Sequence, residues 1–258
     1  PNFDDNSDAI MKRHRIREVL TSPPSDRPVT VCGWVRTKRV SKQFAFLVVS
    51  DGSTQDTLQL IVDHGTPAFE SLDQISTGAA IRADGVPRAS PGTGQRLEVQ
   101  VSTLEVLGRA PTDYPLQKKG HTLEFLREIG HLRPRTNTFG AVFRIRNTLA
   151  RAVHEFFQGR GFVWAHTPII TGSDCEGAGE MFHVGTGDPQ NTEFFGKRAF
   201  LTVSGQLEAE FMALSLGDVY TFGPTFRAEN SNTSRHLSEF WMIEPEMAFC
   251  NLEGDMDL

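Results

Sequence analysis

The sequence predicts a protein of two domains: an all-β barrel, and after it an α+β domain in which helices flank an antiparallel sheet. Two observations carry this prediction. Apolar and polar residues alternate with a period of two from Val29 to Leu107, whereas from Thr138 the apolar residues recur at helical spacing. A basic stretch punctuated by prolines lies between the two patterns. The boundaries we expect are 1–27 for an N-terminal extension with a short helix, 28–108 for the barrel, 109–137 for a linker and 138–258 for the second domain.

Composition excludes several classes of protein. With 258 residues and 38% hydrophobic content, the chain can bury real cores. No apolar run approaches the roughly 18 residues of a membrane helix, and the acidic start PNFDDNSDAI does not have the pattern of a signal peptide. The three cysteines, Cys32, Cys175 and Cys250, are too few and too scattered for a disulfide framework or a zinc site. We therefore expect a cytoplasmic protein in which each cysteine is a small buried hydrophobe.

The net charge of −6 is unevenly distributed. Residues 109–160 carry ten Lys and Arg against four Asp and Glu, or +6, while residues 161–258 carry four against fifteen, or −11. A basic middle beside an acidic end is consistent with a polyanion bound at one place and a metal-chelated nucleotide at another. Simple solvation of the surface would give the same counts.

The first domain should be a five-stranded barrel. A short helix around Ile16–Leu20 is expected to end before Ser22-Pro23-Pro24, because proline cannot continue a helix. Strands are then expected from Val29, over Gln43–Ser50 and over Thr57–Val62, followed by a helix over Pro67–Gln74 and strands over Ala79–Val86 and Arg96–Leu107. One helix between the third and fourth of five strands is the order of an OB-fold, a fold that binds single-stranded nucleic acid. Small SH3-like barrels and sandwiches remain possible on the pattern alone.

Basic and aromatic residues lie together in the first two strands of this barrel. Phe44 and Phe46 follow the basic residues Arg36, Lys38, Arg39 and Lys42. Such a mixture is typical of a groove in which bases stack. The alternative is that both phenylalanines are core residues, and for Phe44 we expect this alternative to hold.

The linker and the start of the second domain have a helical pattern. One short helix is expected near Leu123–Gly130, and a long amphipathic helix from Thr138 to a cap at Gly159 or Gly161. A strand follows that ends at Pro168.

Residues 219–249 should form an antiparallel hairpin with a long polar loop. The first strand runs to Phe226, so that Arg227 and Glu229 project together, and the second runs over Phe240–Phe249. On the second strand Phe240, Glu244 and Glu246 share one face, and the apolar side chains Trp241, Ile243, Met247 and Phe249 share the other, which should pack on a core. A fixed guanidinium, carboxylates and an exposed ring on one surface would suit a nucleotide.

This hairpin resembles the second signature motif of the class II aminoacyl-tRNA synthetases. The resemblance rests on Phe226-Arg227-x-Glu229, then Arg235-His236, then Glu239-Phe240, and the surrounding stretch is most similar to the asparaginyl members of the aspartyl, asparaginyl and lysyl subgroup. It implies an ATP site in which Arg227 holds the α-phosphate and is the catalytic residue. It also implies that Glu229 contacts the adenosine end, that Arg235 and His236 reach the β- and γ-phosphates, and that Phe240 stacks on adenine.

The same resemblance assigns further residues of the second domain. The order of a long helix, a strand and Pro168 is similar to the first motif of the family, which forms the dimer interface. It implies a homodimer with Pro168 at its interface. Glu176, in the glycine-interrupted loop Ser173–Phe182, is placed to meet the α-ammonium group of the amino acid, and Gln206 to contact the same group.

The resemblance implies that the residues three and four positions after Gln206 contact the side chain of the amino-acid substrate. Aspartyl enzymes carry a lysine where this chain has Ala209, and Glu210 follows. A carboxylate can accept a hydrogen bond from an amide NH₂ and repels the carboxylate of aspartate. The resemblance therefore implies L-asparagine as the substrate.

In the barrel, the resemblance implies that Phe46 stacks on the middle base of the anticodon, a uridine, and that Arg39 and Gln59 read the edge of that base. The implied activity is ligation of L-asparagine to tRNA(Asn) through an asparaginyl-adenylate, with ATP and Mg²⁺. The third motif of the family is absent from these 258 residues, so we expect the chain to end inside the catalytic domain. Two alternatives stay open: an aspartyl-tRNA synthetase that does not discriminate between tRNAs, and an inactive truncated or paralogous protein that binds tRNA.

Overall fold

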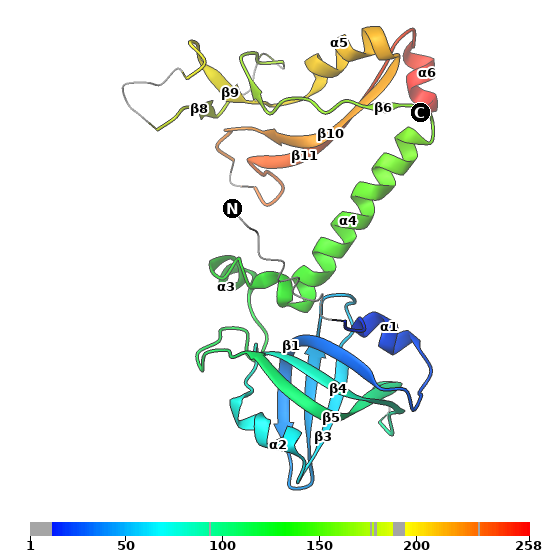
Figure 1. Ribbon diagram of the computed structural model, residues 1–258. Coiled ribbons are helices and arrows are strands. Elements are labelled where there is room, and N and C mark those ends of the chain that lie inside the picture. The colour runs from blue at the N-terminus through cyan, green and yellow to red at the C-terminus, as the bar shows by residue number, and fades with distance from the viewer. Residues whose placement is uncertain (1–11, 93, 176, 178–179, 188–193, 232) are drawn as a thin grey trace, which may run out of the picture. The chain divides into compact units, whose positions relative to one another are not determined.

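The computed structural model describes residues 12–258, apart from 93, 176, 178–179, 188–193 and 232 (Figure 1). It divides the chain into two compact units, one ending at Ile145 and the other running from Arg146 to Leu258. Each unit has its own strands and its own core. They are described separately below.

The first unit contains the predicted barrel. Its strands are β1 (Val29–Val40), β2 (Phe44–Ser50), β3 (Leu58–Asp63), β4 (Ala80–Ala89) and β5 (Leu97–Gly108), and they close in the order β1-β2-β3-β5-β4. The helical connection between β3 and β4 consists of α2 (Pro67–Glu70) and the 3₁₀ turn η1 (Ser71–Gln74). The OB-fold prediction is thus confirmed.

The barrel closes at a parallel seam. All neighbouring strands pair antiparallel except β3 and β5, which pair in parallel from Gln59 opposite Glu98 to Ile61 opposite Gln100. Along β2, Ala45, Leu47 and Val49 are buried in the barrel while the residues between them are partly exposed. The period-two pattern therefore separates an inner from an outer face.

Helix α1 (Ile16–Thr21) is attached to the barrel by Asp51. The carboxylate of Asp51 accepts the backbone N–H of Ile16 at 3.0 Å and the backbone N–H of Ser53 at 2.9 Å. Ile16 itself is fully buried in the barrel core. A helix of six residues is too short to be stable alone, so these contacts are what hold it.

Three helical segments of the described chain follow the barrel. Helix α3 (Leu123–Glu128) is capped by the hydroxyl of Thr122, and the 3₁₀ turn η2 spans Arg133–Arg135. Helix α4 runs over Asn137–Gln158 and ends just before Gly159, as the sequence predicts.

The second unit contains two small sheets. The predicted hairpin is formed by β10 (Asp218–Phe226) and β11 (Glu239–Met247), and β6 (Val163–Trp164) joins β10 in parallel. The other sheet has the order β7-β9-β8, from Ile170–Thr171, Ala199–Leu201 and His183–Val184. Helices α5 (Gln206–Leu216) and α6 (Leu252–Asp257) complete the unit.

One expectation about the hairpin is wrong in part. Met247 packs against the buried cluster of Phe157, Phe162 and Tyr220, but Trp241 and Ile243 on the same face are 47% and 48% exposed. Among the described residues, the buried core of this unit reaches only one end of that face. Cys250 is also exposed rather than buried, and Cys32 and Cys175 are half-buried.

None of the described helices has the length and apolar character needed to cross a membrane.

Candidate nucleotide and nucleic-acid sites

The predicted ATP residues line one open pocket at the end of the hairpin, which we call the hairpin pocket. Its volume is about 320 Å³, and it is lined by Arg227, Glu229, Ser231, Arg235, His236, Leu237, Ser238 and Phe240. All five residues proposed from the motif for ATP are therefore brought together, although they are spread over fourteen positions of the sequence.

Arg227 and Phe240 line this pocket from the paired ends of β10 and β11. Arg227 follows the last residue of β10, and its backbone N–H donates to the carbonyl of Ser238 at 3.0 Å, which extends the pairing by one step. Phe240 lies opposite Thr225 on the neighbouring strand. As a result the guanidinium carbon of Arg227 lies 5.4 Å from the centre of the Phe240 ring. This is the distance of a cation–π contact.

Glu229, Arg235 and His236 belong to the loop and not to the strand. All three are exposed, and the hydroxyl of Thr233 is hydrogen-bonded to the ring of His236. The strand ends at Phe226 as expected, and backbone pairing continues only to Arg227, so the expectation that Glu229 also projects from this strand is wrong. The loop is anchored at its start, where the N–H of Ala228 donates to the carbonyl of Glu180 at 2.7 Å.

Two of the residues predicted to bind the amino-acid substrate, Gln206 and Glu210, lie on α5. The side-chain amide of Gln206 donates to the carboxylate of Glu210 at 3.0 Å, one helical turn further along, and both side chains are exposed. Ala209 is fully buried against Ala165 and Val219. Glu176, the third residue assigned to this substrate, lies outside the described residues.

The first turn of α5 is held by Glu244, a role that sequence reasoning missed. Its carboxylate accepts the hydroxyls of Ser204 and Thr221, and the backbone N–H of Gly205 at 3.3 Å. Ser204 and Thr221 are each 2% exposed. The contact joins residues 40 positions apart, so no local pattern could reveal it.

Carboxylates gather beside Glu244. Burial and then the neighbouring carboxylates Glu210, Glu244 and Asp255 raise the pKa of Glu246 above its ordinary value. No group of three potential ligands for a metal ion occurs among the described residues.

Pro168, assigned to a dimer interface, is exposed between β6 and β7. It lines a small cavity of about 160 Å³ with Trp241, Glu244 and other residues of the hairpin.

The barrel presents an aromatic groove on the outer face of β2 and β3, which we call the barrel groove. Phe44, Phe46, Gln59 and Ile61 line one side of it, and Ser90, Pro91, Gly92, Gly94, Gln95 and Glu98 line the other, enclosing about 480 Å³. Phe44 is half-buried in this groove with its ring 4.9 Å from that of Phe46, so the expectation that it is a core residue is wrong. Residue 44 has the same strand parity as residue 46, and both point outward.

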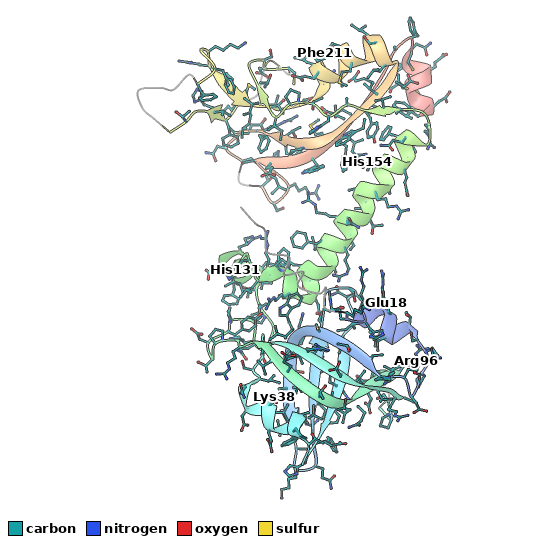
Figure 2. All side chains as sticks on the ribbon, in the orientation of Figure 1. Glu18, Lys38, Arg96, His131, His154 and Phe211 are labelled. Atoms are coloured by element: carbon teal, nitrogen blue, oxygen red, sulfur yellow. The ribbon has the colours of Figure 1, made fainter. Side chains whose placement is uncertain are left out.

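None of the predicted basic residues is among the described residues that line the groove, although Arg39 lies on the same face of the sheet. Arg39 is paired directly with Phe46 across β1 and β2, so the two side chains lie on one face. Arg36 instead binds the carbonyl of Arg135 and the side chain of Asn137, and Lys38 donates to the carbonyl of Leu72 at 2.9 Å. Figure 2 shows Lys38 on the side of the barrel where α2 and η1 lie.

Comparisons with known proteins match both parts of the chain. The family model of tRNA synthetases class II (D, K and N) matches residues 123–258, and the model of the OB-fold nucleic acid binding domain matches residues 29–107.

Two bacterial relatives have high sequence identity to the chain. The asparagine--tRNA ligase of Microcystis aeruginosa is 60% identical over 250 residues, which are 95% of this chain and 55% of that protein. The asparagine--tRNA ligase of Desulfotalea psychrophila is 59% identical over 249 residues, with the same coverage of 95% and 55%. The chain thus spans about half the length of the curated relatives it matches.

A solved structure shares the fold. The asparaginyl-tRNA synthetase from Pyrococcus horikoshii, complexed with asparaginyl-adenylate, superposes with a TM-score of 0.82 at 28% identity and covers 96% of this chain and 56% of that chain.

Proposed function

The chain belongs to the class II tRNA synthetases of the D, K and N group, and from this premise we propose that the protein ligates L-asparagine to tRNA(Asn) in the cytoplasm at the expense of ATP. The observation that carries the proposal is the hairpin pocket, which gathers two guanidinium groups, an imidazole and an aromatic ring around one open space. The named relatives favour asparagine over aspartate as the substrate.

In the first step a carboxylate oxygen of asparagine attacks the α-phosphorus of ATP, and the bond from that phosphorus to the bridging oxygen breaks, releasing pyrophosphate. Arg227 donates to the α-phosphate oxygens, where negative charge develops, and Phe240 stacks on adenine. Arg235 and His236 bind the β- and γ-phosphates and Glu229 the adenosine end. No side chain acts as a nucleophile, so the protein contributes position and charge.

Mg²⁺ enters this proposal only as the ion that ATP carries on its own phosphates. The described residues do not offer a cluster of protein ligands for it.

Selection of the amide rests on the first turns of α5. Gln206 and Glu176 would bind the α-ammonium group, and Glu210 would accept a hydrogen bond from the side-chain NH₂ of asparagine. The Gln206–Glu210 hydrogen bond supports this assignment, because it places the Glu210 carboxylate, a hydrogen-bond acceptor, beside Gln206, which is proposed to bind the α-ammonium group. Aspartate would bring a second carboxylate towards Glu210 and be repelled.

In the second step a ribose hydroxyl at the end of tRNA attacks the carbonyl carbon of the adenylate, and AMP leaves. The barrel groove would hold the anticodon, with Phe46 stacked on the middle base and Arg39 and Gln59 at its edge. We also propose a homodimer with Pro168 at its interface.

The proposal is tested by the exchange of labelled pyrophosphate into ATP, measured on this chain and on the product of its complete open reading frame. Exchange should depend on asparagine and not on aspartate. Replacing Arg227 by Ala should lower the rate by about 10²–10³-fold, the usual cost of losing one donor to a developing oxyanion.

Arg198→Ala is the matched control, since Arg198 is an exposed arginine outside the hairpin pocket. Near-normal exchange by a folded Arg227→Ala protein would remove the assignment of Arg227. Exchange with aspartate would favour a non-discriminating aspartyl enzyme, and tRNA binding without any exchange by either form of the protein would favour an inactive paralogue.

A further inference from the structure

Glu98 is one of the residues that line the barrel groove, and three side chains donate hydrogen bonds to its carboxylate. Its Oε2 atom accepts hydrogen bonds from the amide of Gln59 at 3.2 Å, from the hydroxyl of Ser90 at 3.0 Å and from the amide of Gln95 at 3.2 Å. Gln59 and Glu98 are direct neighbours across the parallel β3–β5 seam, so their side chains share a face. The carboxylate is half-buried.

This arrangement fixes which end of the Gln59 amide faces the carboxylate. An ionised carboxylate has no proton to donate and can only accept, so the amide must turn its NH₂ group towards Glu98. The carbonyl oxygen of Gln59 then points away from Glu98. In the described part of the chain no hydrogen bond to that carbonyl oxygen is recorded.

The orientation of an amide decides which base it can read. Uracil presents an N3–H donor between two carbonyl acceptors, whereas cytosine presents an N3 acceptor beside an amino donor. A Gln59 carbonyl accepts from the N3–H of uracil, while the guanidinium of Arg39 donates to a uracil carbonyl. The same carbonyl would face the N3 lone pair of cytosine and repel it.

We propose that Glu98 is a positioning residue for base selection: by holding the NH₂ group of Gln59 it leaves the carbonyl oxygen to select a base that carries an N3–H, a uridine. Ser90 and Gln95 assist because their hydrogen bonds hold the carboxylate in place. This inference rests on the proposed function, in which the barrel groove binds the middle base of the anticodon.

The test measures binding of anticodon stem–loop RNAs to the full chain. The RNAs differ only at the middle anticodon base, which is uridine, cytidine or 3-methyluridine; the last keeps both carbonyls but lacks the N3–H. Wild type should prefer uridine to either of the others by roughly tenfold, the effect of one unpaired polar group. Glu98→Ala should reduce this preference to within about twofold, because the amide of Gln59 is then free to rotate.

A double-mutant cycle separates positioning from direct contact. Gln59→Ala should remove the preference, and adding Glu98→Ala to it should change the ratio no further. Glu98→Gln, which keeps an acceptor oxygen of the same shape, should retain more of the preference than Glu98→Ala. A further loss of preference in the double variant would mean that Glu98 contacts the base itself and would overturn the inference.

Two controls keep affinity apart from selectivity. Phe46→Ala should weaken binding of all three RNAs by roughly tenfold and leave their ratio unchanged, because stacking tolerates any base. Glu105→Ala, an exposed glutamate on the same strand β5, should change neither. Equal binding of the three RNAs by wild type would instead refute the proposed function of the barrel, whereas full selectivity in Glu98→Ala would refute only the inference.

Discussion

In the second unit, Glu246 is a residue whose charge is disfavoured by its surroundings. Burial and the adjacent carboxylates Glu210, Glu244 and Asp255 raise its pKa, so the folded chain favours the protonated form. A folded-state pKa above the unfolded value means that stability is lost as pH rises from the ordinary carboxyl range through the raised pKa. Ionised Glu246 is therefore destabilising at neutral pH.

Glu246→Gln should have a higher Tm than wild type at pH 7, and the difference should shrink as pH falls towards about 4, because the carboxyl then becomes increasingly protonated in the unfolded state as well. The measurement is thermal unfolding between pH 4 and pH 8. Glu239→Gln, at an exposed position of the same strand β11, serves as the control. Parallel Tm profiles for wild type and Glu246→Gln would show that Glu246 does not have this effect.

At the scale of residues, the sequence predicted what lies close together in the chain and missed what is joined across it. Arg227, Arg235 and Phe240 could be found because they belong to one hairpin, and the structure brings them into one pocket. Glu98 and Glu244 could not, since each accepts hydrogen bonds from residues about 40 positions away. The expectation for Phe44 fails because it follows the aromatic character of the side chain and not the alternation along β2, which places residues 44 and 46 on the same outer face.

Among the elements, α1 depends on one carboxylate. Burial alone would raise the pKa of Asp51, but hydrogen bonds from Ser53 and Ile16 and the charge of Arg13 outweigh it and leave the pKa lowered. A lowered folded-state pKa gives stability that is present above the ordinary carboxyl value and is lost as pH falls through the folded value. The side chain of Asp51 is only 2% exposed, so solvent screens these contacts little.

Asp51→Asn should destabilise the first unit by about 1–3 kcal/mol at pH 7, because an amide cannot accept at both positions and its NH₂ group is left facing donors. Urea unfolding followed by circular dichroism measures this loss, which should narrow towards acid pH. Asp56→Asn, at an exposed aspartate five positions further, provides the comparison. If both variants unfold at the same urea concentration, Asp51 does not hold α1.

Helix α5 is one of the elements that the sequence analysis does not predict. Its apolar residues surround the helix instead of forming a stripe: Ala209 and Ala213 are buried, while Leu214 is 86% exposed and Phe211, labelled in Figure 2, is 60% exposed. Without a period of 3.6 there is no amphipathic signal. The barrel strands were predicted well because each has one buried and one solvated face.

Across the whole molecule, the two units differ in the size of their cores. Among the described residues, the barrel core is a single large cluster that includes Ile16, Leu47, Leu60 and Leu97, whereas the second unit has two small clusters. The sequence predicted two domains from the change of period, but not that much of the apolar hairpin face would be exposed. A small buried core gives less stability to offset chain entropy.

The second unit should therefore unfold at a lower temperature than the barrel. The three tryptophans report on this directly, since Trp34 lies in the barrel and Trp164 and Trp241 lie in the second unit. Fluorescence melting of Trp34→Phe should follow the second unit alone, and that of a Trp164→Phe, Trp241→Phe double variant should follow the barrel alone. Coincident transitions would show that the units unfold as one.

The parallel seam between β3 and β5 also has a consequence for synthesis. Gln59 is translated well before Glu98, and the seam that aligns them can form only after β5 has left the ribosome. A nascent chain that ends before residue 98 would contain Phe44 and Phe46, the second of which is proposed to stack on a base. It would lack Glu98, which is proposed to orient Gln59 for the selection of uridine over cytidine. The preference of the barrel groove for uridine would therefore arise only when β5, the last strand of the barrel, is in place.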